Sequence, residues 1–130
     1  MSPSAPSFPR CFEYILMFRK SNKLTHKGEP TISKEEFIKW SNGTWSFNTE
    51  KVKSIGHPAC FPIELPTRCI KMLTYKNDIV LDPFMGSGTT AVACIREDRN
   101  FIGFEIDENY YNIASKRIKD EIDKKANRLF

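Results

Sequence analysis

The stretch with the clearest chemical potential is DPFMGSGTT, which runs from Asp82 to Thr90 directly after the apolar residues IVL. Gly86 and Gly88 separate this apolar run from a run of small residues, a pattern that predicts a strand, a tight turn and a helix. At such a turn the backbone N–H groups and the positive end of the helix point outward, and glycines let a ligand approach closely. The stretch is therefore a candidate ligand cradle. Because it contains Asp-Pro-Phe, it is also a candidate catalytic strip.

A carboxylate farther along the chain favours the cradle. Glu105 lies at the end of the next predicted strand, 17 residues after Gly88. In nucleotide-binding α/β units an acidic residue at this place accepts hydrogen bonds from the ribose hydroxyls. The turn and Glu105 together indicate a ligand that contains adenosine. The simpler alternative is that Glu105 is only a solvated carboxylate at a strand end.

The residues around the glycines narrow the kind of ligand. No lysine follows Gly88, so the turn does not match the phosphate-binding loop of nucleoside triphosphatases. The third glycine of the dinucleotide fingerprint is also missing, which disfavours a nicotinamide-dependent oxidoreductase. Asp82 at the strand end favours a cationic or zwitterionic ligand, and S-adenosylmethionine is such a ligand.

The elements that position these residues fill the C-terminal half of the chain. The patterns predict a helix over 67–75, a strand over 77–82, a helix over 89–98, a strand over 100–106 and a helix over 107–126. This order is typical of a parallel α/β unit. Two strands do not complete a parallel sheet, which is normally covered on both faces. Either the N-terminal strand and other short segments complete the sheet, or the chain leaves an open edge that a second polypeptide fills. We predict the second case, a sheet that is incomplete in this chain.

The N-terminal part has a different character. Pro3, Pro6 and Pro9 predict an irregular start, and CFEYILMF at 11–18 predicts a strand. Ser33 and Glu36 form a capping-box pattern, which predicts a helix that runs to about Trp40. The aromatic residues Trp40, Trp45 and Phe47 are candidates for stacking on a base, but packing in the core is the more common role for aromatic residues near a capped helix.

The basic excess of the chain lies in its N-terminal part. Residues 1–57 carry nine Lys and Arg against five Asp and Glu, whereas residues 58–130 carry eleven of each. A local basic excess suits contact with a polyanion such as nucleic acid, although a solubilising surface explains it equally well. The candidate phosphate contacts are Arg10, Arg19, Lys20, Lys23 and Lys27.

Length and composition exclude other classes. The 130 residues suit one domain, and no apolar run approaches the roughly 20 residues that span a bilayer. The start lacks a signal-peptide pattern, so the expected location is cytoplasmic. Cys11, Cys60, Cys69 and Cys94 are separated by 49, 9 and 25 positions, which predicts no metal site.

Three segments follow one another along the chain: GHPACFPIELPTRCIKMLTYKNDIVL, DPFMGSGTT and NFIGFEIDENYYNIASKRI. Together they resemble the cofactor-binding half of the DNA amino-methyltransferases that modify adenine N6 or cytosine N4. More narrowly, they are similar to the circularly permuted, beta-type branch, in which the catalytic motif and target-recognition segment precede the cofactor motifs. The resemblance is strong over residues 56–119. SPSAPSFPRCFEYILMFRK at 2–20 is more weakly similar to the segment that follows the catalytic motif.

This resemblance implies a fold, a cofactor and a substrate. The expected fold is α/β, a partial Rossmann-like methyltransferase fold with parallel strands and flanking helices. The expected cofactor is S-adenosylmethionine and the expected substrate is double-stranded DNA. Residues 1–55 would then be a partial DNA-facing, target-recognition segment, and residues 56–130 the cofactor-binding unit. The residues implied to contact the cofactor are His57, Pro58, Ala59, Phe61, Asp82, Phe84, Gly86, Ser87, Gly88, Thr89, Thr90 and Glu105.

The chain departs from the family pattern at the catalytic motif. In the family this motif is Asp, Asn or Ser followed by two prolines and an aromatic residue, which hold the target amine and base. None of the eight prolines here is adjacent to another, so no catalytic residue is assigned. In the permuted order the motif lies before Met1, which predicts a fragment or split subunit that is inactive without a missing N-terminal segment or partner. The alternative is a non-catalytic remnant that binds cofactor or DNA.

Overall fold

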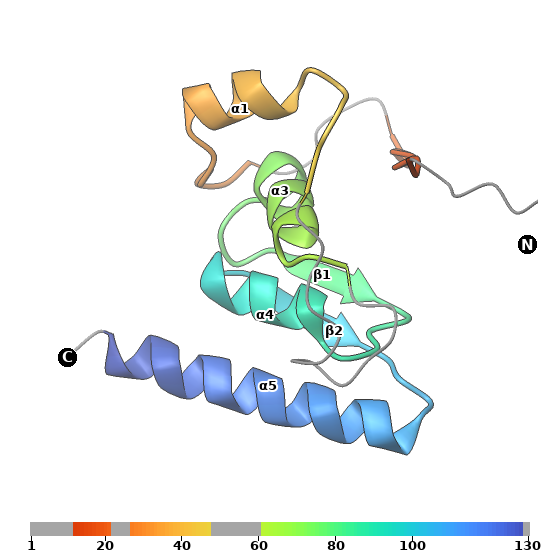
Figure 1. Cartoon of the computed structure of the whole chain (residues 1–130). Coiled ribbons are helices and arrows are strands. Elements are labelled where there is room, and N and C mark those ends of the chain that lie inside the picture. The colour runs from red at the N-terminus through yellow and green to blue at the C-terminus, as the bar shows by residue number, and fades with distance from the viewer. Residues whose placement is uncertain (1–11, 22–26, 48–60, 129–130) are drawn as a thin grey trace, which may run out of the picture.

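The computed structural model describes residues 12–21, 27–47 and 61–128 (Figure 1). Within these ranges the elements are α1 (Lys34–Trp40), α3 (Glu64–Leu73), β1 (Ile79–Asp82), α4 (Thr89–Arg96), β2 (Asn100–Gly103) and α5 (Glu108–Asn127). Each helix and strand predicted after residue 60 is present, with its ends shifted by a few residues. The capping box is also confirmed, because the Ser33 side chain accepts from the Glu36 backbone and the Glu36 side chain accepts from the Ser33 backbone.

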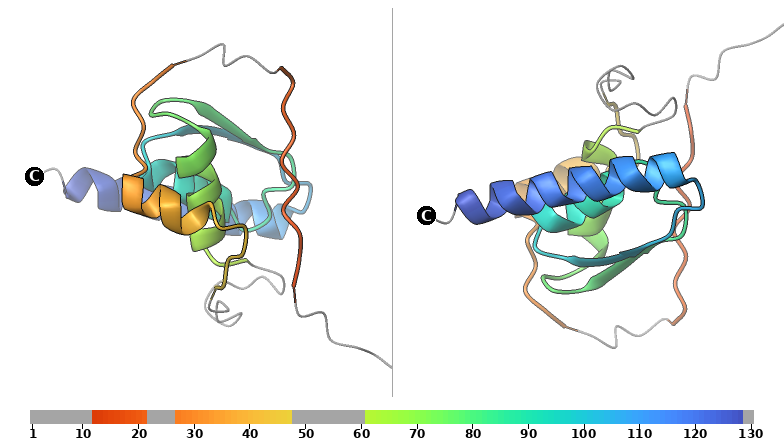
Figure 2. Two further views of the ribbon diagram at one scale, coloured as in Figure 1. Left: turned by 90° about the horizontal axis from the view of Figure 1, so that it is seen from above. Right: turned by 90° about the horizontal axis from the view of Figure 1, so that it is seen from below.

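The two strands form a parallel pair joined by α4. Val80 lies opposite Phe101 and Asp82 opposite Gly103, so the carboxyl ends of both strands reach the same edge. The two views of Figure 2 show α3, α4 and α5 on one face of this pair. The predicted parallel α/β arrangement is therefore confirmed, and both strands deliver their following residues to one place.

Helix α4 lies at the centre of the packing. It contacts α3, α5 and β2, and six of its eight residues are buried. Ala93 and Cys94 join Ile70 of α3 in the core, against which Val80 and Phe101 of the strands pack. A helix that is apolar on nearly every side suits this position, because neighbours surround it.

The opposite face of the strand pair is open. Ile79 and Leu81 of β1 are 64% and 61% exposed, and Ile102 of β2 is 49% exposed. Among the described residues the sheet has only these two strands, and the helices lie on its other face. The prediction of an incomplete sheet is therefore confirmed for the part of the chain that the structure describes.

The strand predicted over 11–18 is wrong for the residues that are described, because 12–18 form no strand. Its apolar side chains are exposed, from 57% for Ile15 to 85% for Phe18. A strand requires hydrogen bonds to a neighbouring strand, and the pattern of the segment alone does not supply that neighbour.

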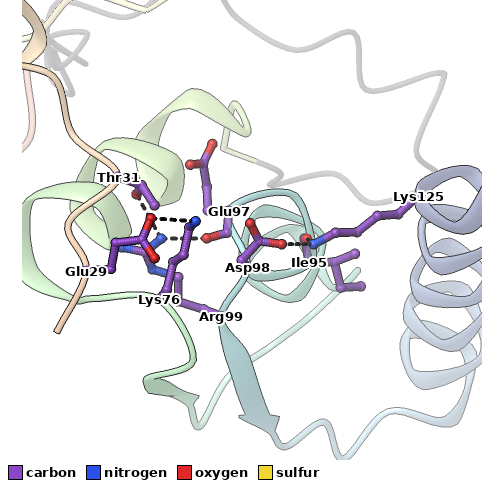
Figure 3. Close-up of polar contacts among 8 residues, drawn as sticks. All are labelled: Glu29, Thr31, Lys76, Ile95, Glu97, Asp98, Arg99 and Lys125. Carbon is purple, nitrogen blue, oxygen red and sulfur yellow. Dashed lines mark hydrogen bonds and ion pairs between the residues drawn. The ribbon is translucent and has the colours of Figure 1, made fainter. Parts of the chain in front are cut away.

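The segment from 27 to 47 is attached to the α/β unit by polar contacts at the amino ends of the strands (Figure 3). The buried Arg99 donates to Thr31 Oγ1 at 2.8 Å and to the Thr74 carbonyl at 2.7 Å. Lys76 forms an ion pair of 2.8 Å with Glu29. These contacts lie at the edge opposite the glycine turn and hold the N-terminal segment against the unit.

Candidate functional site

The turn between β1 and α4 has the conformation that its glycines predict. Gly86 and Gly88 have φ angles of 54° and 80°, in the left-handed region that other residues adopt at a cost. The Gly88 N–H donates to the Met85 carbonyl at 2.9 Å, which closes the turn. A Cβ on Gly88 would lie 3.1 Å from the Cβ of Ala114, so α5 would have to shift by a few tenths of an ångström to accept a side chain there.

Glu105 is brought directly to this turn. Its Oε2 accepts from the Gly86 N–H at 2.8 Å, and its Oε1 accepts from the Asp107 N–H at 2.9 Å. Each carboxylate oxygen has a second lone pair, so the group keeps acceptor capacity for a diol. The glycine turn and Glu105, which is 17 residues after Gly88 in the sequence, are thus in contact.

Asp82 and Phe84 lie at the same edge. Asp82 is the last residue of β1, and its Oδ1 accepts from the Phe84 N–H at 3.0 Å. This bond shapes the start of the turn and leaves the Phe84 ring 89% exposed. Ile106, which follows Glu105, is also fully exposed. An acidic edge with uncovered apolar side chains suits a ligand that has both a charged and an aromatic part.

The side chains of Ser87 and Thr89 face α5. They are 3% and 4% exposed, and Arg117 Nη1 lies 2.9 Å from Ser87 Oγ and 3.3 Å from Thr89 Oγ1. Arg117 also donates to the Ser87 carbonyl at 2.6 Å. Arg117 is not among the site residues predicted from the sequence. The signal was its position three residues after Ala114, on the face of the helix that meets the turn.

The other predicted cofactor residues are placed as follows. Thr90 is half-buried in the first turn of α4, and Phe61 is 41% exposed just before α3. His57, Pro58 and Ala59 lie outside the described residues. The assignment of these side chains to a cofactor therefore stays a prediction.

The predicted DNA contacts are only partly described. Arg19, Lys20 and Lys27 are exposed, whereas Arg10 and Lys23 lie outside the described residues. Trp40, Trp45 and Phe47 surround the Arg68 guanidinium, whose carbon lies 5.5, 5.4 and 4.6 Å from their ring centroids. The packing interpretation of these aromatic residues thus fits better than base stacking.

In 12–21, 27–47 and 61–128 no three His, Cys, Asp or Glu side chains are grouped to hold a metal ion. No helix in these ranges is long and apolar enough to cross a membrane. A cavity of about 260 Å³ lies between α4, α5 and the start of α3, on the helix side of the sheet. Its lining includes charged residues of both signs: Arg96, Arg117, Asp120, Glu121 and Lys124.

The fold and the site place the chain in a class. A parallel strand pair with a glycine turn and a strand-end carboxylate is typical of nucleotide-binding α/β units, and the structural neighbours of the chain are S-adenosylmethionine-dependent methyltransferases. The chain is similar to M1.HpyAVI solved with S-adenosylmethionine, at 45% identity and a TM-score of 0.50, with 53% of this chain and 34% of that chain covered. It is also similar to the Thermus thermophilus protein TTHA0409 in complex with S-adenosyl-L-methionine, at 32% identity and a TM-score of 0.56, covering 70% and 34% of the two chains.

A family model described as DNA methylase, of the N6_N4_Mtase type, matches residues 1–116, and the chain belongs to this family. It is 45% identical to the type II methyltransferase M.BglI of Bacillus subtilis over 83% of this chain and 31% of M.BglI. It is 37% identical to M.Cfr9I of Citrobacter freundii over 86% of this chain and 38% of M.Cfr9I. The chain therefore spans about a third of the length of these curated relatives.

Proposed function

We propose that this chain is the cofactor-binding part of a DNA amino-methyltransferase that acts on adenine N6 or cytosine N4. The observation that carries the proposal is the hydrogen bond between Glu105 and the backbone of Gly86, which joins the strand-end carboxylate to the glycine turn. The relatives M1.HpyAVI and TTHA0409 are both solved with S-adenosylmethionine, which supports the same cofactor here.

The residues of the turn fit such a cofactor. Glu105 would accept from the ribose hydroxyls, and the exposed Phe84 would contact an apolar part of the molecule. Asp82 would favour the positive charges of the methionine part. When bound, S-adenosylmethionine supplies a methyl group that is carried on a positively charged sulfur. As the target amine bonds to the methyl carbon, the carbon–sulfur bond breaks, the sulfur keeps its electron pair, and the amine loses a proton. The chain's own contribution is to hold and orient the donor.

The groups that hold the target base would come from outside these 130 residues. The sequence has no adjacent prolines, and the chain spans about a third of its curated relatives. A second polypeptide could cover two exposed apolar surfaces of this chain: the open face of β1 and β2, and the segment 12–18. We therefore propose a fragment or split subunit, in the permuted order, that is inactive until the catalytic segment is supplied.

The first test is binding. We expect calorimetric titration to show that the chain binds S-adenosylmethionine and not NAD, because the turn lacks the third glycine of the dinucleotide fingerprint. Binding of NAD in place of S-adenosylmethionine would overturn the proposal.

The second test is methyl transfer to double-stranded DNA. The chain is assayed alone and with a polypeptide that contains the part of M.BglI outside the matched region. We expect transfer only in the mixture, and none when the two prolines of the catalytic motif are replaced by alanine. If the mixture binds cofactor and DNA but transfers no methyl group, the chain is a non-catalytic binding module.

The exposed basic residues Arg19, Lys20 and Lys27 are the proposed DNA contacts within the described residues. Replacing all three by glutamine should weaken DNA binding by the mixture and make the affinity less dependent on salt, because phosphate contacts release counterions. A variant with Lys116→Gln and Lys119→Gln, two exposed lysines on α5, serves as the control.

A further inference from the structure

We infer that Arg117 is a positioning residue that fixes the glycine turn in the shape that binds the cofactor. Arg117 lies on α5, one helical turn after Ala114, and its Nη1 reaches three oxygens of the turn and of the start of α4. It acts through Ser87 and Thr89 rather than on the ligand. The cofactor part of this inference rests on the proposed function.

The carbonyl contact fixes a whole peptide unit. The Ser87 carbonyl accepts from Arg117 at 2.6 Å, and the N–H of the same peptide unit, that of Gly88, donates to the Met85 carbonyl at 2.9 Å. Because a peptide unit is planar, holding both of its ends sets its orientation. This matters at a glycine, which has more rotational freedom to lose than any other residue.

The other side of the turn is held by the sheet. Gly86 donates to Glu105 at 2.8 Å, and Met85 donates to the Phe104 carbonyl at 2.9 Å. The turn is thus fixed between the end of β2 on one side and Arg117 on the other. A binding loop that is already ordered loses less entropy when a ligand binds.

Burial makes the guanidinium difficult to replace. The Ser87 and Thr89 side chains are almost fully buried, and removing a hydrogen-bond donor from a buried polar group is unfavourable. The planar guanidinium carries several donors in a fixed geometry, whereas an ammonium is a compact point charge on a flexible stem. Arg117 on α5 can therefore donate to three oxygens of Ser87 and Thr89.

A second arginine at the same helix interface provides the matched control. Arg96 of α4 forms two hydrogen bonds, of 2.7 and 2.9 Å, with the buried Glu121 of α5. It joins the same two helices but is not bonded to the turn in these contacts. Arg96→Met and Arg117→Met therefore both remove an arginine from the α4–α5 interface, and only the second removes the contacts to Ser87 and Thr89.

The experiment compares the whole chain with Arg117→Met, Arg117→Lys and Arg96→Met, at a temperature well below each melting transition. Amide hydrogen exchange of Gly88 is measured without ligand, and the Kd for S-adenosylmethionine is measured by calorimetry. We expect Arg117→Met to speed Gly88 exchange and to raise the Kd by about tenfold or more, as loss of a charged hydrogen bond implies. Arg117→Lys should restore part of the affinity, and Arg96→Met should leave both readouts near those of the original chain.

The outcomes separate the two proposals. If Arg117→Met folds and changes neither exchange nor Kd, or if Arg96→Met changes both equally, the positioning role is overturned. If Arg117→Met does not fold, Arg117→Lys decides, because its Kd should exceed that of the original chain. If the original chain does not bind S-adenosylmethionine, the proposed cofactor binding fails, and the ligand-free exchange of Gly88 alone decides the role of Arg117.

Discussion

At the scale of single residues, Glu105 gives the sharpest prediction. Its carboxylate accepts from two backbone N–H groups and has acceptor capacity left for a diol. Glu105→Gln replaces one acceptor oxygen by a donor, so we expect the affinity for S-adenosylmethionine to fall by about tenfold or more. Calorimetry measures the change. Glu108→Gln, which removes an exposed carboxylate three residues away, should bind like the original chain.

Gly88 allows the effect of backbone strain to be separated from that of crowding. Gly88 and Gly43 have φ angles of 80° and 81°, but an added Cβ meets Ala114 at 3.1 Å only at Gly88 and nothing within 4 Å at Gly43. We expect Gly43→Ala to lower the free energy of unfolding by about 1 to 2 kcal/mol, the cost of the left-handed conformation. Gly88→Ala should cost clearly more, as measured by urea unfolding. Equal losses would contradict the close packing of α5 on the turn.

At the scale of elements, the contact between α4 and α5 should make stability depend on pH. The hydrogen bond from Arg96 lowers the pKa of Glu121 below its usual 4.5, and the hydrogen bond from Lys125 lowers the pKa of Asp98 below its usual 3.8. A carboxylate whose pKa is lowered by folding stabilises the fold above its usual pKa, and this stability is lost as the pH falls through the folded value. The melting temperature should therefore be steady near neutral pH and fall below about pH 5.

Glu121→Gln tests this assignment. It should lower the free energy of unfolding at neutral pH by about 1.5 to 3 kcal/mol, the contribution of a hydrogen bond to a charged group, and reduce the loss of stability in acid. Thermal unfolding from pH 7 to pH 3 measures both effects. Asp123→Asn, at an exposed position on the same helix, should keep the original pH profile. If both variants behave alike, the Arg96–Glu121 pair is not the source of the acid sensitivity.

At the scale of the whole molecule, Arg68 attaches the N-terminal segment to α3. Its guanidinium lies against Trp40, Trp45 and Phe47, and Lys71 of the same helix pairs with Glu36 at 2.6 Å. Because the chain has only two tryptophans, its fluorescence reports on this contact. Arg68→Ala should shift the emission to longer wavelength while α5 remains folded by circular dichroism. Lys39→Ala, at an exposed position of α1, should leave the emission unchanged.

The amino-acid sequence alone was enough to predict the candidate ligand edge of this protein. The apolar run, the two glycines, the small residues after them and the acid at the next strand end are local signals, and each fixes a local conformation. Their order required the carboxyl ends of two parallel strands to meet. The sequence associated Glu105 with the glycine turn as parts of one ligand site, and the hydrogen bond between Glu105 and Gly86 shows that the two lie together.

The residues that hold the glycine turn and attach the N-terminal segment became visible in the tertiary structure alone. Arg117, Arg99 and Arg68 reach partners 30, 68 and 28 residues away, at Ser87, Thr31 and Trp40, and no local pattern encodes such pairs. The segment 12–18 shows the converse, because its strand-like pattern forms no strand without a neighbour to pair with. Local propensity specifies what a segment can form, whereas packing and hydrogen-bond partners specify what it does form.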